Sequence, residues 1–167
     1  MSFYAHEFEA SIEVLDWDGT RYTVIRLPAE VAADLPLDAH PRLRVEGEIG
    51  DVPMVWTWNP APAVLGDGWF CYLSRAKLIE RELAPDTVTS VRFNVADQDG
   101  VDVPGELMLA LAGNADAKTA WDGLTPGRQR GLCHRVDSAK RQATRDKRAT
   151  TIVAALARGD DPFPRRR

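Results

Sequence analysis

The stretch LRVEGEIGDVPMVWTW, residues 43–58, decides the fold of the first half of the chain. From Leu43 to Ile49, apolar residues or glycine alternate with charged residues, which is the period of a half-buried β-strand. The dipeptide Gly50-Asp51 predicts a tight turn, because glycine and aspartate both tolerate a positive φ. The alternation resumes after the dipeptide. The stretch therefore predicts an antiparallel hairpin.

Similar alternation lies on both sides of this hairpin. The dipeptide Asp18-Gly19 predicts the turn of an earlier hairpin, and short helices are expected after Pro28 and after Ser74, which suits an N-cap. Further strands are predicted at 8–14, 21–27, 69–73 and 87–95. Seven or so short strands between turns indicate a small closed or partly open β-barrel.

The hydrophobic period changes after Pro104, where helical spacing replaces alternation. Thr125 followed by Pro126 predicts the start of one helix, and Thr144 is expected to cap the last helix, which Gly159 ends. We therefore predict an α+β chain with about three helices after the barrel. Its expected parts are a barrel at 1–103, a helical segment at 104–159 and a disordered tail at 160–167.

Length and composition exclude several classes of protein. The 167 residues, of which 44% are hydrophobic, can form a core without disulfides, and no apolar run reaches the length of a membrane span. Residues 1–10 carry acidic side chains where a secretory signal would have a basic start, so we expect a cytoplasmic protein without membrane insertion. Cys71 and Cys133 lie far apart in the sequence, and three scattered histidines have no metal-ligand spacing. We expect no cofactor and no metal.

Charge is distributed unevenly along the chain. Residues 1–112 hold 8 Lys and Arg against 19 Asp and Glu, a net charge of −11, whereas residues 113–167 hold 13 against 6, a net charge of +7. A basic helical segment can contact phosphate or nucleic acid. Because an acidic half is covalently attached, we expect that half to be the main partner of these cations, and we do not expect nucleic acid as a partner.

The strongest candidate site is a group that we call the basic corner, made of Lys140, Thr144, Arg145 and Arg148. A helix that begins at Thr144 would place free N–H groups beside two guanidinium groups, an arrangement that suits a carboxylate or a phosphate. The alternative is that Arg145 and Arg148 pair with acidic groups of the barrel and fasten the two halves. The internal ion pair is the outcome that we expect.

Aromatic residues form a second candidate, because Trp56 and Trp58 share one strand face and Trp69 and Tyr72 follow soon after. Together they could line a barrel mouth in which a small ligand stacks. A small barrel also needs large side chains to fill its interior, so packing in the core is the stronger interpretation.

Cys71 is the one candidate nucleophile that the sequence analysis considers for catalysis. Cys71 with His6, His40 or His134 could form a thiolate and base, but no nucleophile signature surrounds Cys71, and a strand cysteine is usually buried and inert. The sequence therefore predicts no enzyme chemistry, and an enzyme of unknown reaction stays an alternative.

Short motifs of the second half occur in a familiar order: Val103-Pro104-Gly105-Glu106-Leu107, Leu124-Thr125-Pro126-Gly127-Arg128, and Ala139-Lys140 with Thr144-Arg145 and Arg148. This order resembles the bacterial YdeI/OmpD-associated family, also labelled bacteriocin-protection. In that family the helical segment commonly follows a small β-barrel domain of unknown function. The first half looks like that barrel in the strand at 8–14, Leu27-Pro28 with Glu30-Val31, Val45-Glu46-Gly47 and Arg92.

The resemblance implies a double-split β-barrel for the first half and no established reaction. Together with the residue patterns, it predicts a cytoplasmic bacterial binding or accessory protein, related to stress or bacteriocin protection, whose partner is a small anion or another protein. One alternative is a DNA- or nucleotide-binding regulator that uses the basic C-terminal helices. The oligomeric state does not follow from these patterns.

Overall fold

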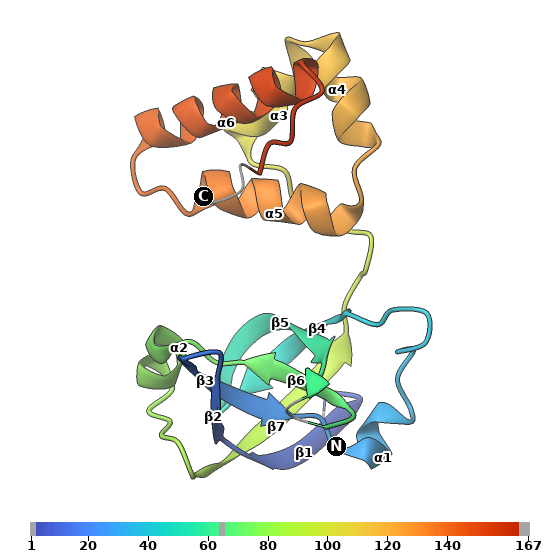
Figure 1. Cartoon of the computed structure of the whole chain (residues 1–167), viewed down its shortest axis with the longest axis vertical. Helices are drawn as coiled ribbons and strands as arrows, with labels where there is room; N and C mark the ends of the chain where they lie inside the picture. The colour runs from blue at the N-terminus through green and yellow to red at the C-terminus, as the bar shows by residue number, and fades with distance from the viewer. Residues whose placement is uncertain (1–2, 64–65, 164–167) are drawn as a thin grey trace. The chain divides into compact units, whose positions relative to one another are not determined.

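A computed structural model describes residues 3–63 and 66–163. The chain divides into two compact units, Met1–Gln98 and Asp99–Arg167 (Figure 1). In the described ranges, the first unit is built from strands and two short helices, and the second from helices. The chain is thus α+β, as predicted. The boundary between the two units follows Gln98, whereas the sequence predicted a boundary after residue 103.

In the described part of the first unit, seven strands form one antiparallel sheet with the order β1-β7-β4-β5-β6-β3-β2. The hairpins predicted around Asp18-Gly19 and Gly50-Asp51 are confirmed as the pairs β2–β3 and β4–β5. Ser74 caps the second short helix by accepting a hydrogen bond from the Lys77 N–H, as predicted. The elements are β1 (His6–Ser11), β2 (Glu13–Trp17), β3 (Thr20–Arg26), α1 (Ala29–Ala32), β4 (Leu43–Ile49), β5 (Val52–Pro60), β6 (Trp69–Tyr72), α2 (Arg75–Glu80) and β7 (Val88–Val95).

Ile12 explains why this sheet is curled. It is the single residue between β1 and β2, yet these two strands are the opposite edges of the sheet. The sheet must therefore bend until its edges approach each other, which gives a half-barrel (Figure 1). The Ile12 N–H donates a hydrogen bond to the Thr87 carbonyl oxygen, and the Ile12 carbonyl oxygen accepts one from the Asp86 N–H, each at 2.8 Å. The single strand predicted over 8–14 is wrong because these contacts bend the chain there. The double-split arrangement stays a prediction.

Gly47 permits a close approach between β4 and β7. It lies opposite Phe93 in the strand register, and a Cβ atom on Gly47 would lie 1.9 Å from the Arg92 carbonyl oxygen and 2.6 Å from the Phe93 Cα. Both are backbone atoms, so no side-chain rotation could relieve such a contact. Only glycine fits at this point of the half-barrel.

The main core of the half-barrel is organised around three large aromatic side chains, Trp56, Trp58 and Phe93. The ring centroids of Trp56 and Trp58 lie 5.9 Å apart at an interplanar angle of 80°, and each ring lies within 5.8 Å of Phe93. Edge-to-face contacts of this kind fill the space between strands that small aliphatic side chains would leave empty. The buried residues around them include Ile12, Ile25, Leu43, Val45, Ile49, Cys71 and Val91.

The second unit contains four helices in its described part, where about three were predicted: α3 (Gly105–Ala112), α4 (Ala115–Asp122), α5 (Pro126–Asp137) and α6 (Gln142–Ala157). The additional helix is α4. Its N-cap is Asn114, whose side chain accepts a hydrogen bond from the Ala117 N–H, and it buries Ala117 and Trp121. The start of α5 is confirmed, because Thr125 is its N-cap and Pro126 is its first residue.

The apolar face of α6 forms the centre of the second core. Ala149, Ile152 and Leu156 pack against Leu107 of α3 and Leu132 of α5. This is the helical spacing that the sequence predicts for a half-buried helix.

The chain continues beyond α6 at Gly159, whose φ of 72° suits the end of a helix. Residues 160–167 were predicted to be a disordered tail, and 164–167 lie outside the described residues. Within the described portion, Asp161 pairs with Arg128 at 2.8 Å. The Arg128 guanidinium lies over the Phe163 ring, with the Arg128 Cζ atom 5.2 Å from the ring centroid.

Candidate functional site

The basic corner lies at the turn between α5 and α6. The first residue of α6 is Gln142, and its N-cap is Arg141, which makes no side-chain capping bond. The N–H groups of Thr144 and Arg145 both donate to the Arg141 carbonyl oxygen, at 3.0 and 3.1 Å. The prediction that Thr144 caps α6 is therefore wrong, since the helix begins two residues earlier and Thr144 lies inside its first turn.

Arg145 forms an internal ion pair, with Glu106 of α3. Its Nε lies 2.8 Å from a Glu106 carboxylate oxygen, and the two side chains are 26% and 18% exposed. Its guanidinium also donates to the Ala139 carbonyl oxygen at 3.1 Å and to the Gln142 side-chain oxygen at 2.5 Å. The predicted ion pair exists, but its acid belongs to the helical unit and not to the barrel. Arg145 therefore connects α3, α6 and the end of α5.

Arg148 has no carboxylate partner among the described residues, so the acid pair predicted for it is wrong. Its Nη1 donates to the Arg135 carbonyl oxygen at 2.7 Å and to the Ser138 hydroxyl at 3.1 Å. Arg135 lies in the last turn of α5, where carbonyl groups lack partners within the helix. Arg148 thus satisfies the C-terminus of α5, and a cation there is also favoured by the helix dipole.

The structure extends the basic corner to Arg141, the N-cap of α6, and the outer part of this group carries charge without an ion-pair partner among the described residues. Lys140 is exposed, and so is Arg141, and neither side chain has an ion pair within the described ranges. Both flank the N-terminus of α6, where the first N–H groups of a helix are free to bind an anion. Arg141 was missed by sequence reasoning, because Thr144 provides a stronger local capping signal than an arginine does.

Glu106 provides a test of the ion pair through its dependence on pH. Hydrogen bonds from Arg145, from its own backbone N–H and from Gln142 lower the pKa of Glu106 from 4.5 to about 2. A lowered pKa in the folded state stabilises the fold above the unfolded-state pKa, and this contribution is lost as the pH falls from 4.5 to about 2. The melting temperature of the wild type should therefore fall more than that of Glu106→Gln between about pH 7 and about pH 3.

Thermal melts of both proteins at the two pH values, followed by circular dichroism, measure this difference. Glu106→Gln retains a hydrogen-bond acceptor for Arg145, so the comparison isolates the titratable charge. Equal decreases in the two proteins would show that the ion pair does not stabilise the helical unit.

The four aromatic candidates are not brought together. Trp56 and Trp58 are core residues, and their buried indole N–H groups have no acceptor among the described residues. The Trp69 indole donates to the Pro41 carbonyl oxygen at 3.2 Å, and its ring borders a hollow beside α1. Tyr72 is 41% exposed and borders two other hollows. No shared barrel mouth is formed by these side chains.

Cys71 lies in β6 opposite Ile25 and is fully surrounded by the core. Burial raises the pKa of its thiol to about 12, so the thiol stays protonated at neutral pH. Burial likewise raises the pKa of Cys133 to about 11. Within the described ranges, no group of three potential metal ligands occurs, and none of the helices there is long and apolar enough to cross a membrane.

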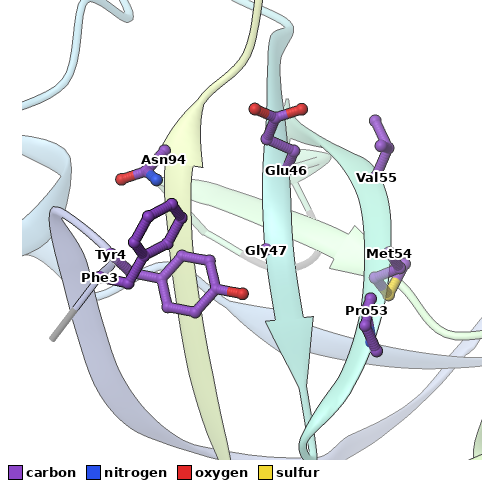
Figure 2. Close-up of a pocket in the computed structure, with 8 residues that line it drawn as sticks. All are labelled: Phe3, Tyr4, Glu46, Gly47, Pro53, Met54, Val55 and Asn94. Atoms are coloured by element: carbon purple, nitrogen blue, oxygen red, sulfur yellow. The ribbon is translucent and has the colours of Figure 1, made fainter.

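A hollow of about 390 Å³ that sequence reasoning missed lies on the outer face of β4, β5 and β7. Figure 2 shows the Tyr4 ring between β7 and β4, beside Gly47, with Asn94 at the rim. The Ala5 N–H donates to the Asn94 side-chain oxygen at 2.7 Å, which holds Phe3 and Tyr4 on this face. Desolvation and a hydrogen bond to Glu48 raise the pKa of the Tyr4 hydroxyl. The hollow could not be predicted because Phe3 and Tyr4 precede every periodic segment.

Comparison with known proteins bears on the helical unit. A search of curated proteins found no match, and neither did a search of solved structures. A family model described as "Bacteriocin-protection, YdeI or OmpD-Associated" matches residues 100–159. The matched range contains all four helices of the second unit. The resemblance seen in the motifs of this segment is confirmed by this match, and residues 100–159 are similar to the family of that description.

Proposed function

We propose that this protein is a binding or accessory protein associated with bacteriocin protection, and that it performs no chemistry of its own. The observation that carries the proposal is the family match over residues 100–159. Its cytoplasmic location, predicted from the sequence, is part of the proposal. So is the prediction that the partner is a small anion or another protein rather than nucleic acid.

The basic corner is the proposed contact surface for this partner. Arg145 and Arg148 are engaged in internal contacts that shape the turn between α5 and α6. Lys140 and Arg141 are exposed beside the N-terminus of α6. Because free N–H groups and unneutralised cations favour negative charge, the group that they bind is a carboxylate or phosphate of the partner.

Inorganic phosphate is a direct probe of the basic corner. Phosphate should raise the melting temperature of the wild type relative to an inert buffer of equal ionic strength, because binding to the folded state stabilises it. The double variant Lys140→Ala with Arg141→Ala should lose this increase. Lys147→Ala is the matched control, since Lys147 is an exposed cation of α6 more than one turn from its N-terminus.

An equal phosphate effect in all three proteins, or none in the wild type, would remove the basic corner from the proposal.

Survival of bacteriocin-sensitive bacteria that express the chain tests the function itself. Expression of the wild type should increase survival, and expression of the double variant should do so less. Unchanged survival with the wild type would overturn the proposed role in protection.

A further inference from the structure

The outer face of β2, β3 and β6 carries a second apolar cluster, separate from the main core. Val24 and Phe70 are buried in it, and Leu15 and Tyr22 pack against them. The cluster continues into Tyr72, whose ring centroid lies 4.7 Å from that of Phe70 and 5.4 Å from that of Tyr22. Since Tyr72 is 41% exposed, an aromatic surface remains open to solvent on this face.

Tyr22 and Tyr72 border a hollow of about 550 Å³ between β3, β6 and α2. Leu73 and Leu78, both buried, contribute further apolar surface. Pockets of this size with mostly apolar walls and a few polar groups are typical of small-ligand sites. The two tyrosine rings meet at an interplanar angle of 45°, so each can offer part of its face to a planar group.

Positive charge is placed at the same hollow. Arg21 and Arg75 are both lining residues. Arg21 is already paired with Asp16, its Nε lying 3.1 Å from a carboxylate oxygen. Arg75 is exposed and has no ion pair or hydrogen bond from its side chain among the described residues. In a half of the chain where acidic residues greatly outnumber basic ones, an unneutralised guanidinium beside exposed aromatic rings is complementary to an anionic aromatic ligand.

We propose that this hollow, bordered by Tyr22, Tyr72 and Arg75, binds a nucleoside phosphate. The base stacks on the tyrosine rings, and the phosphate is bound by the Arg75 guanidinium. Base-on-aromatic stacking and a charge-assisted phosphate contact are both favourable, and the site provides one of each. This site lies in the half-barrel and is independent of the basic corner.

The charge of the half-barrel favours a small nucleotide over a long nucleic acid. Residues 1–98 hold 8 Lys and Arg against 16 Asp and Glu, a net charge of −8, and a polyanion that extends beyond the hollow would meet this charge. A single phosphate needs only the local cation. The hollow also has room for one base and its sugar rather than for a run of stacked bases.

Calorimetric titration of the full chain with three probes tests both parts of the ligand. Adenosine monophosphate carries a base and a phosphate, adenosine lacks the phosphate, and ribose 5-phosphate lacks the base. The wild type should bind adenosine monophosphate roughly tenfold more tightly than either of the other two. Equal affinity for all three, or no binding of adenosine monophosphate, would overturn the proposal.

Variants assign each part of the ligand to its residue. Arg75→Ala should weaken binding of adenosine monophosphate about tenfold while leaving adenosine unaffected. Tyr72→Ala should weaken both, and Tyr72→Phe should retain both because it keeps the ring. Lys77→Ala is the matched control, since Lys77 is a cation of the same short helix that does not line the hollow.

Circular dichroism melts verify that each variant is folded. If Arg75→Ala and Lys77→Ala had the same effect, the site would not be the one that we propose. Binding of a single-stranded oligonucleotide without binding of adenosine monophosphate would likewise overturn it, and a steep salt dependence would then assign the surface to nucleic acid. The titrations are made in the background of the double variant Lys140→Ala with Arg141→Ala, so that phosphate binding at the basic corner does not contribute to them.

Discussion

Gly47→Ala is expected to unfold the half-barrel or to destabilise it by at least about 3 kcal/mol, at the upper end of the usual cost of overpacking. The added Cβ would lie 1.9 Å from the Arg92 carbonyl oxygen. Relief requires β7 to move away from β4, and the two strands are held together by the register that pairs Gly47 with Phe93. The central part of the sheet would therefore lose pairing.

Urea denaturation followed by tryptophan fluorescence measures this effect. Gly105→Ala is the control, because a Cβ on Gly105 meets no atom within 4 Å, and alanine is the better helix former at the start of α3. That variant should match or exceed the wild type in stability. A Gly47→Ala protein with the unfolding midpoint of the wild type would show that the strands do not approach as closely as the structure indicates.

Trp58→Ala is expected to reduce the free energy of unfolding by about 3–5 kcal/mol, the range for truncating a buried aromatic side chain. Trp58 is fully buried and contacts Trp56, Phe93 and Phe8. Truncation would leave a cavity among these rings, because a close-packed core relaxes only partly around a removed side chain.

Trp58→Phe should cost much less. Phenylalanine keeps a ring in the core and removes an indole N–H that is buried without an acceptor among the described residues, and such an unsatisfied donor is itself unfavourable. Trp17→Ala, at a position that is 40% exposed, should change stability by less than about 1 kcal/mol. Equal effects of Trp58→Ala and Trp17→Ala in urea denaturation would place Trp58 outside the core.

Local signals in the sequence were sufficient to predict the hairpins. At both turns, the dipeptides Asp18-Gly19 and Gly50-Asp51 have positive φ at each residue, as the residue types predict. The N-caps Ser74 and Thr125 were predictable for the same reason, because the capping side chain bonds a backbone group three residues away. Structure that depends on neighbours in the sequence could thus be inferred from the sequence.

Features that depend on distant partners could not be predicted. The break at Ile12 results from hydrogen bonds to Asp86 and Thr87. The pattern from Phe8 to Val14 alternates without interruption, so it contains no sign of the break. Helix α4 was different, because Asn114 followed by apolar residues at 117 and 121 is a local signal that the sequence analysis did not use.

The basic corner illustrates the same division. Its positive charge was evident from the sequence, but the choice of Glu106 as the partner of Arg145 depends on how α3 packs against α6. Spacing alone could not distinguish Glu106 from the many other carboxylates of the first half. The start of α6 was misplaced because Thr144 is a good capping residue type, whereas the structure starts the helix at Gln142 without a side-chain cap.

The pairing of β1 with β7 has a consequence for the order of events during synthesis. His6 is opposite Phe93 in this pair, so β1 leaves the ribosome before β7 and cannot pair until β7, the last strand of the half-barrel, has also emerged. Sheet contacts that are so distant in the sequence form slowly, whereas the contacts of a helical unit are more local and form quickly. For most of the time that the half-barrel is being synthesised, β1 is therefore a strand without its partner. We expect chaperones that bind exposed strand edges to bind β1 during this time.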